Sequence, residues 1–287
     1  MLLAESLESG GHTRARGLFS WCDNGDRMTM PALTSSLKSC VGPWLKRIGI
    51  FAQKYPSSLG PAVRLVKGKI GIEIGGPSDF FRNWNHPLPI YKKIGSLDNC
   101  DFSRNTTWTS HADSFVFHPR KAPGKTIFSE GSSLTAVRDG TYDFILSCHN
   151  LEHFANPVKA LKEWQRIARP GGALVLVLPN YLGTFDHRRK LTLVAHMLED
   201  FDRNTQEDDL THLPEILRDH DLSEDPGAGT LEEFRERSLN NFQNRCLHHH
   251  VFDENNSRDL LTAIGINVLS VETVPTCHII LLARFPM

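Results

Sequence analysis

Residues 142–178 decide the fold class, and they read YDFILSCHNLEHFANPVKALKEWQRIARPGGALVLVL. The run begins with a buried-type strand from Tyr142 to Ser147. It ends with an almost wholly apolar strand from Ala173 to Leu178, as expected where helices cover both faces of a sheet. Between them Asn156-Pro157 predicts a helix start, because Asn caps free N–H groups and Pro suits the first helical position. A strand, a helix and a strand in this order predict a right-handed parallel crossover.

Strand-length segments on both sides of this unit extend the predicted sheet. The apolar run before Gly75 is the first of them, and the chain after residue 265 supplies the last two. Together with the two strands above they predict an α/β fold with a doubly wound, Rossmann-like, mostly parallel seven-stranded sheet. The five further segments are residues 69–74, 91–97, 126–128, 266–271 and 278–283.

The rest of the chain divides into regions of different composition. Residues 1–30 are polar without sustained periodicity, and we expect a mobile leader there. Residues 31–65 repeat apolar side chains at three- and four-residue spacing, which predicts an N-terminal helical flank. The catalytic core is expected over residues 66–180 and 256–287. Residues 181–255 carry long polar stretches and acidic runs, and we expect a helical lid insertion that binds the acceptor.

Composition and charge narrow the class of protein further. The chain has 287 residues, 40% of them hydrophobic, and a formal charge of −1. Because nucleic-acid binding normally requires a basic surface, a nucleic-acid partner is not expected. No apolar run approaches the ~20 residues of a membrane span, and no signal peptide is recognisable. We therefore expect a cytoplasmic monomer or homodimer with no membrane partner.

The loops that follow the strands are where chemistry is expected, because open α/β sheets bind ligands outside the carboxyl ends of their strands. Gly75 and Gly76 allow close approach of the backbone to a ligand. The loop does not fit a dinucleotide site, because Pro77 offers no N–H group and Asp79 would repel a phosphate. A phosphate-binding P-loop at Gly124-Lys125-Thr126 is also excluded, because this segment precedes a strand instead of following one.

A series of short motifs follows the predicted strands: Glu73-Ile74-Gly75, Asp98, Tyr142 to Ser147, Leu151-Glu152-His153 and Arg169-Pro170-Gly171-Gly172. Taken together, these motifs resemble the class I S-adenosylmethionine-dependent methyltransferases of the methyltransferase type 11 kind, over roughly residues 68–180. The chain departs from that family in the first loop, where Pro77 and Asp79 stand in place of further glycines.

What the resemblance implies is an S-adenosylmethionine site. Gly75 and Gly76 would line the methionine part, Asp98 would accept hydrogen bonds from the ribose hydroxyls, and Glu130 would lie near the adenine. Glu73 would bond either loop N–H groups or the ammonium of the cofactor, because a buried carboxylate needs a partner. The implied cofactor-binding set is completed by Pro77, Ser147 and His149.

Histidines and charged groups of the later loops are the candidates for a small-molecule methyl acceptor. Histidine titrates near neutrality and serves as a general base where the acceptor is an O–H, N–H or C–H group. Arg189 and Arg245 are candidates for holding a carboxylate, which would favour an amino acid or another small acid. The candidate catalytic residues are His149, His187, Asp209, His212, His248 and His250, and the candidate acceptor-binding residues are His153, Asp186, Arg189 and Arg245.

A metal site is not expected from the run His248-His249-His250. Adjacent residues of an extended segment point to opposite faces, so only His248 and His250 would share one. With Asp209 or His212 they would make a site, but lining an acceptor pocket is the favoured interpretation. Two other functions stay open: an inactive cofactor-binding or partner protein with the same fold, and a nicotinamide-dependent reductase, which Pro77 disfavours.

Overall fold

The computed structural model describes residues 55–106, 110, 112–274 and 277–287. The predicted leader lies outside these residues, as does most of the predicted flank. Within the flank, α2 (Leu59–Val66) is helical and buries Ala62, Leu65 and Val66.

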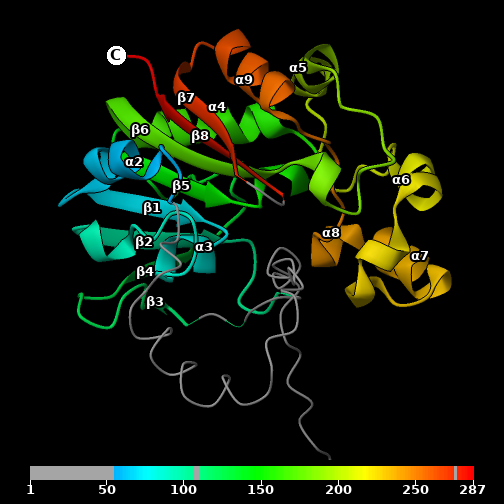
Figure 1. Ribbon diagram of the computed structural model, residues 1–287, viewed down its shortest axis with the longest axis horizontal. Coiled ribbons are helices and arrows are strands. Elements are labelled where there is room, and N and C mark those ends of the chain that lie inside the picture. The colour runs from blue at the N-terminus through cyan, green and yellow to red at the C-terminus, as the bar shows by residue number, and fades with distance from the viewer. Residues whose placement is uncertain (1–54, 107–109, 111, 275–276) are drawn as a thin grey trace, which may run out of the picture.

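A mostly parallel sheet forms the centre of the molecule (Figure 1). Its eight strands follow the order β3-β4-β2-β1-β5-β6-β8-β7. The run from β4 to β6 is parallel, whereas β8 is antiparallel to both β6 and β7. The strands are β1 (Ile70–Ile74), β2 (Ser96–Asp101), β3 (Ser114–Phe115), β4 (Gly124–Phe128), β5 (Tyr142–Cys148), β6 (Ala168–Pro179), β7 (Asn267–Val274) and β8 (His278–Arg284).

The predicted fold class is confirmed, with two differences in the strands. The short strand β3 pairs antiparallel with β4 and brings the number of strands from the predicted seven to eight. The predicted strand at residues 91–97 is wrong: a 3₁₀ turn, η2 (Tyr91–Lys93), precedes β2, which continues to Asp101. The polar sequence of β2 is accommodated in the sheet because Asp98 and Asn99 both find hydrogen-bond partners there.

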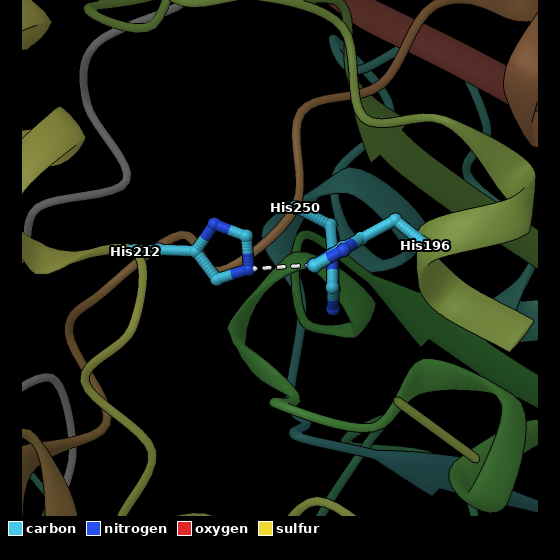
Figure 2. A group of neighbouring side chains, drawn as sticks. All are labelled: His196, His212 and His250. Carbon is cyan, nitrogen blue, oxygen red and sulfur yellow. Dashed lines mark hydrogen bonds between the residues drawn. The ribbon is translucent and has the colours of Figure 1, made fainter. Parts of the chain in front are cut away.

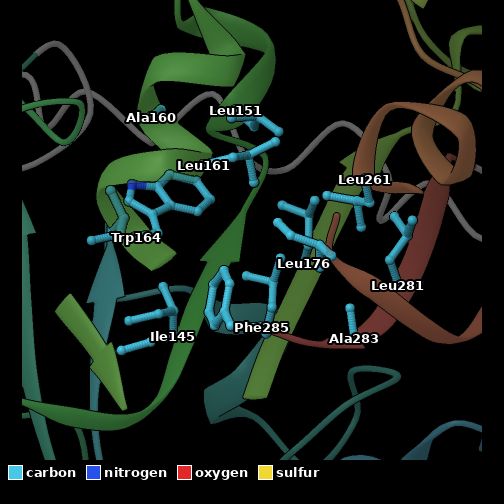
Figure 3. Close-up of a cluster of buried hydrophobic side chains, with 14 of the residues drawn as sticks. Ile145, Leu151, Ala160, Leu161, Trp164, Leu176, Leu261, Leu281, Ala283 and Phe285 are labelled. Carbon is cyan, nitrogen blue, oxygen red and sulfur yellow. The ribbon is translucent and has the colours of Figure 1, made fainter. Parts of the chain in front are cut away.

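Helices cover both faces of the sheet. One face packs against α4 (Pro157–Ile167), α5 (Val194–Asp202) and α9 (Glu254–Ala263). The other face packs against α2 and the short helix α3 (Asp79–Arg82). Figure 3 shows the first of these apolar clusters, in which Trp164 of α4 and Phe285 lie over β5, β6 and β8.

Residues 180–253 connect β6 to α9 and are built from short helices. Figure 1 places α6, α7 and α8 together at one side of the sheet. Asn180 caps the first turn, and Thr230 caps α7 through a capping box with Glu233. Besides α5, the elements are η4 (Tyr181–Gly183), α6 (Leu213–Asp219), η5 (Leu222–Glu224), η6 (Pro226–Ala228), α7 (Leu231–Leu239) and α8 (Asn241–Asn244).

Candidate functional site

A cavity of about 660 Å³ opens at the carboxyl ends of the parallel strands, a volume typical of small-molecule sites. The order of the strands reverses between β1 and β5, and this switch point is where open α/β sheets bind ligands. The expected convergence of the strand loops is confirmed by the residues that line the cavity. They include Gly75 to Ser78, Asp101, Glu130, Cys148 to Asn150 and Pro179, together with His278 and residues of the 181–255 insertion.

The loop after β1 is held close to the sheet by its backbone. The N–H of Gly75 donates to the carbonyl of Cys100, and the N–H of Gly76 donates to Asn99 Oδ1 at 2.9 Å. A Cβ on Gly75, which has φ +80°, would lie 2.8 Å from Asn150 Oδ1. A Cβ on Gly76 would lie 2.5 Å from the carboxyl carbon of Glu73. Both positions therefore require glycine for this approach of the backbone to the cavity.

Glu73 lies beneath this loop with its side chain fully buried. Its carboxylate accepts hydrogen bonds from Ser78 N at 3.2 Å, from Ser78 Oγ at 2.6 Å and from the Tyr91 hydroxyl. Burial raises the pKa of Glu73 to about 7. Glu73 was expected to bond either loop N–H groups or the ammonium of the cofactor. The structure shows the bond to the loop, and Glu73 is not among the residues that line the cavity.

The acidic residue of β2 that reaches the cavity is Asp101. Asp98 lies three residues earlier in the strand, where its two oxygens accept from Lys125 N at 2.8 Å and the Tyr142 hydroxyl at 2.9 Å. The sequence placed the end of the strand at Asp98, and that placement is corrected here because β2 runs on to Asp101. Asp101 thus occupies the position beside Gly75 that the resemblance assigned to Asp98.

The remaining residues predicted for the cofactor have mixed positions. Glu130 lines the cavity after β4, and Pro77 lines it after β1. His149 lines it after β5 with a φ of +47°, and its Nε2 lies 2.8 Å from Nδ1 of His278. Burial lowers the pKa of His149 well below its ordinary value, so this imidazole stays neutral. Ser147 differs, because it is buried within β5 and is not among the lining residues.

A second wall of the cavity carries a histidine paired with a carboxylate. His248 Nδ1 lies 2.5 Å from Asp186 Oδ2, and the His248 ring lines the cavity. Although burial opposes the charged forms, the pKa of Asp186 is held well below its ordinary value by His248 and Arg189. Asp186 in turn raises the pKa of His248 against the effect of burial. The ring of His153 packs edge-on against His248, and its Nδ1 lies 3.0 Å from the carbonyl of Leu247.

Glu152 belongs to the same wall, and the sequence analysis did not single it out as a site residue. Its side chain is fully buried, it lines the cavity, and neither carboxylate oxygen has a hydrogen-bond partner in the described part of the chain. Burial raises the pKa of Glu152 to about 7. The available signal was its place beside His153 in the 3₁₀ turn η3 (Leu151–His153), directly after β5. His278, at the start of β8, was missed because no motif marks it.

The two predicted carboxylate-binding arginines are already paired with carboxylates of the chain. Arg189 is buried, does not line the cavity, and donates to Asp186 Oδ1 at 2.9 Å and Glu215 Oε1 at 3.1 Å. Arg245 does line the cavity, where it donates to Glu130 and to Glu207 Oε2 at 3.1 Å. Arg245 thereby connects the insertion to the loop after β4.

Several other predicted acceptor residues lie away from the cavity lining. His187 is 3.4 Å from Asp221, and Asp209 accepts from the backbone and hydroxyl of Thr211. His212 and His250 belong to a second histidine cluster with His196 (Figure 2). His248 and His250 were expected to share a face, but the chain bends at His250 and the two rings join different clusters.

Comparisons with known proteins bear on the middle of the chain. Residues 114–176 match the family described as "Methyltransferase domain". A probable methyltransferase, ltbC, from Aspergillus luteorubrus is 39% identical over 61 residues, which cover 20% of this chain and 21% of that protein. The chain therefore matches about a fifth of the length of this curated relative.

Solved structures with a similar fold are distant from this chain. A SAM-dependent methyltransferase from Methanosarcina mazei is 15% identical, with 79% of this chain and 97% of that chain covered and a TM-score of 0.43. A 1,6-didemethyltoxoflavin-N1-methyltransferase from Burkholderia thailandensis is 11% identical, with 90% and 93% covered and a TM-score of 0.43.

The sheet order, the glycine loop after β1 and the cavity at the switch point define a Rossmann-like α/β protein with a cavity where such sheets bind ligands. Residues 114–176 match the methyltransferase domain family, in agreement with the methyltransferase resemblance that the sequence motifs predict for this part of the chain. Among the described helices, none is both long and apolar enough to cross a bilayer.

Proposed function

We propose that this protein is an S-adenosylmethionine-dependent methyltransferase that acts on a small polar metabolite. The observation that carries the proposal is one cavity bounded on one side by the loop of Gly75 and Gly76 with Asp101, and on the other by His248, His153 and Glu152. The first side suits a nucleoside with an amino-acid tail. The second side suits a polar acceptor placed against the first.

The residues present fit the cofactor. Gly75 and Gly76 line the cavity, and Asn150, which also lines it, has an amide nitrogen with no hydrogen-bond partner among the described residues. A carboxylate at Asp101 suits a ribose diol because it accepts two hydrogen bonds. When bound, the cofactor supplies a methyl group already activated by its sulfonium. The protein has to align the acceptor and exclude water.

The second wall supplies the groups for handling a proton. Asp186 orients His248 through Nδ1, which leaves Nε2 to take a proton from an acceptor O–H or N–H group. Glu152 offers two buried oxygens to a donor group of the acceptor, and such a pairing would satisfy an otherwise unpaired carboxylate. A sulfur acceptor of the thioether kind needs no base, so the accepting atom stays open.

A carboxylic acid acceptor was expected to bind Arg189 and Arg245. Both arginines pair with carboxylates of the chain itself, so they give this narrower expectation no support. We infer that residues 181–255 cover the cavity as a lid, which Arg245, Glu207 and His248 support by lining it. A cytoplasmic location and a monomeric or homodimeric state also stay proposals. Light scattering after size-exclusion chromatography tests the second of them.

Binding of S-adenosylhomocysteine, measured by isothermal titration calorimetry, tests the cofactor assignment. We expect Asp101→Ala to weaken binding by about 30-fold or more, because two charge-assisted hydrogen bonds are lost. Asp98→Asn is the matched control and should leave the affinity within about threefold of the parent. Absence of binding to the parent protein, or the reverse order of the two variants, would contradict the proposal.

Methyl transfer needs a separate measurement, because an inactive cofactor-binding protein would give the same binding result. Incubation of a small-metabolite extract with methyl-labelled S-adenosylmethionine should yield labelled product with the parent protein. His248→Asn is expected to remove that label if the acceptor is an O–H or N–H group, while cofactor affinity stays unchanged. Binding without any labelled product would favour the inactive alternative.

A further inference from the structure

A cluster of three histidines, His196, His212 and His250, lies in the insertion, outside the cavity lining (Figure 2). Asp200 lies within 4 Å of two of them. His196 and Asp200 come from successive turns of α5, and His212 stands immediately before α6. His250 follows the bend after His248 and is completely buried at its side chain. Three segments far apart in the sequence therefore bring one ring nitrogen each to within 4.8 Å of one another.

The distances between these groups match those around a tetrahedral zinc ion. Zinc binds imidazole nitrogen at about 2.0–2.1 Å, which places tetrahedral ligand atoms about 3.3 Å apart. His196 Nε2 lies 3.0 Å from His212 Nε2 and 3.4 Å from Asp200 Oδ2. His250 Nε2 lies 3.8 Å from the same oxygen of Asp200. The three ring nitrogens lie within 4.8 Å of one another, so side-chain movements of up to about 1.5 Å bring them and Asp200 Oδ2 to the spacing of a tetrahedral shell.

An unsatisfied polar atom points to the same ligand. Asp200 Oδ2 is buried and accepts no hydrogen bond within the part of the chain that the structure describes. The other oxygen of Asp200 accepts from the Thr205 hydroxyl at 3.2 Å, an arrangement that orients a coordinating carboxylate. Because imidazole suits zinc and cobalt better than magnesium or calcium, the ligand set selects a transition metal.

We propose that His196, Asp200, His212 and His250 bind one zinc ion in a closed, four-ligand structural site. The site joins α5, the start of α6 and the segment that carries His248 to the cavity wall. The buried apolar cluster of the insertion is small, formed by Ile216, Ala228, Phe234 and Leu247, and a metal crosslink would compensate for it. This replaces the expectation of no metal site and is independent of the proposed methyl transfer.

A second group with ligand-like spacing is Glu152, His153 and His248. It offers three protein ligands and faces the cavity, so an ion there would have an open position and a different role. Asp186 already holds His248 as part of the acceptor wall. Metal located at this group is therefore an alternative outcome that the experiment has to separate from the proposal.

Elemental analysis of the full chain, purified without a histidine tag, tests the site. We expect about one zinc per chain in the parent protein, and a loss of about tenfold or more in His196→Ala and in His212→Ala. His153→Ala is the matched control and should keep its zinc. No zinc after dialysis against zinc salt, or loss of zinc only in His153→Ala, would overturn the proposal.

Spectroscopy keeps the test decisive if an alanine variant fails to fold. Cobalt-substituted parent protein should show the intense visible absorption of a tetrahedral site. His212→Cys should still bind the metal and should add a thiolate charge-transfer band, because cysteine is also a good ligand for zinc and cobalt. A cobalt spectrum of six-coordinate type, or a His212→Cys protein that binds cobalt without the thiolate band, would exclude this ligand set.

Discussion

The sheet core and the 181–255 insertion are held together by different interactions. In the core, large apolar side chains such as Trp164, Phe144 and Tyr91 are fully buried between helices and strands. In the insertion, the buried apolar cluster has four residues, and many of the other buried side chains are polar or charged. Arg189 with Asp186 and Asp225 with His220 and Arg237 are examples. An apolar pattern therefore specifies the core, whereas the insertion depends on specific polar partners.

This difference explains the two walls of the cavity. The wall after β1 belongs to the core, and its loop is fixed by Glu73, Asn99 and Ser78 before any ligand arrives. The opposite wall joins the insertion to the core where His248 meets His153 and Glu152. The two carboxylate oxygens of Glu152 have no hydrogen-bond partner among the residues that the structure describes. The first wall is preorganised, and the second is completed by what binds there.

The largest effect is expected for Trp164→Ala. The indole is fully buried in the core, and its N–H donates to the carbonyl of Gly131 at 2.9 Å, next to the cavity. We expect a loss of about 4 kcal/mol in the free energy of unfolding, from the lost apolar contacts and the cavity left behind. Chemical denaturation measures it. Trp84, which is 74% exposed, gives the control Trp84→Ala, and equal losses in both variants would refute the assignment of the core.

The corresponding test in the insertion is Arg189→Met. The guanidinium is 1% exposed and pairs with Asp186 and Glu215, so its removal leaves a buried carboxylate with less compensation. We expect a loss of about 3 kcal/mol in the free energy of unfolding. The control is Arg218→Met, whose partner Asp219 is reached at the surface. A neutral Arg189→Met would mean that polar contacts do not hold the insertion.

The contrast between apolar packing in the core and polar contacts in the insertion also explains which parts of the fold could be predicted from the sequence. The succession of strands along the chain and the ends of β1 and β6 followed from apolar runs that stop at glycine or proline. β2 was misplaced because a central strand with the sequence SLDNCD lacks an apolar pattern, and the oxygens of Asp98 and Asn99 accept hydrogen bonds from residues distant in the sequence. The error moved the candidate ribose carboxylate from Asp101 to Asp98.

The sequence proposed several of the residue types in the second wall of the cavity, but not how they are arranged. His248, His153 and Asp186 do meet, because a histidine-rich segment of the insertion returns to the loop after β5. Nothing local in the sequence indicates that Arg189 turns inward toward Glu215, or that a bend separates His250 from His248. Such contacts join residues tens of positions apart, and periodicity carries no information about them.

A smaller effect, which depends on pH, tests the preorganised wall. Glu73 has an ordinary pKa of 4.5 that burial raises to about 7, so the folded state binds the proton more tightly. The free energy of unfolding should therefore fall as the pH rises from about 4.5 to about 7. Glu73→Gln should remove this part of the slope, a change of at most about 3 kcal/mol. Denaturation of both proteins from pH 4.5 to 8 measures it.

The groups that face Glu73 do not titrate in this range. Burial raises the pKa of both Tyr91 and Cys148 well above their ordinary values, and the charge of Arg82 is constant. The slope that Glu73→Gln removes therefore reports on Glu73 itself. Identical slopes in the parent and the variant would mean that the carboxyl is hydrated, and that the loop after β1 is less rigidly held than the hydrogen bonds indicate.

The smallest effect compares one helix cap in each region. Thr230 caps α7 in the insertion through Glu233, and Asn156 caps α4 in the core by accepting from Lys159 N at 2.9 Å. Each alanine variant should lose about 1 kcal/mol in the free energy of unfolding. If the chain unfolds in one step, Thr230→Ala and Asn156→Ala shift the same thermal transition. If Thr230→Ala shifts only a separate transition at lower temperature, the insertion unfolds independently of the sheet core. Its polar contacts then form on a core that is already folded.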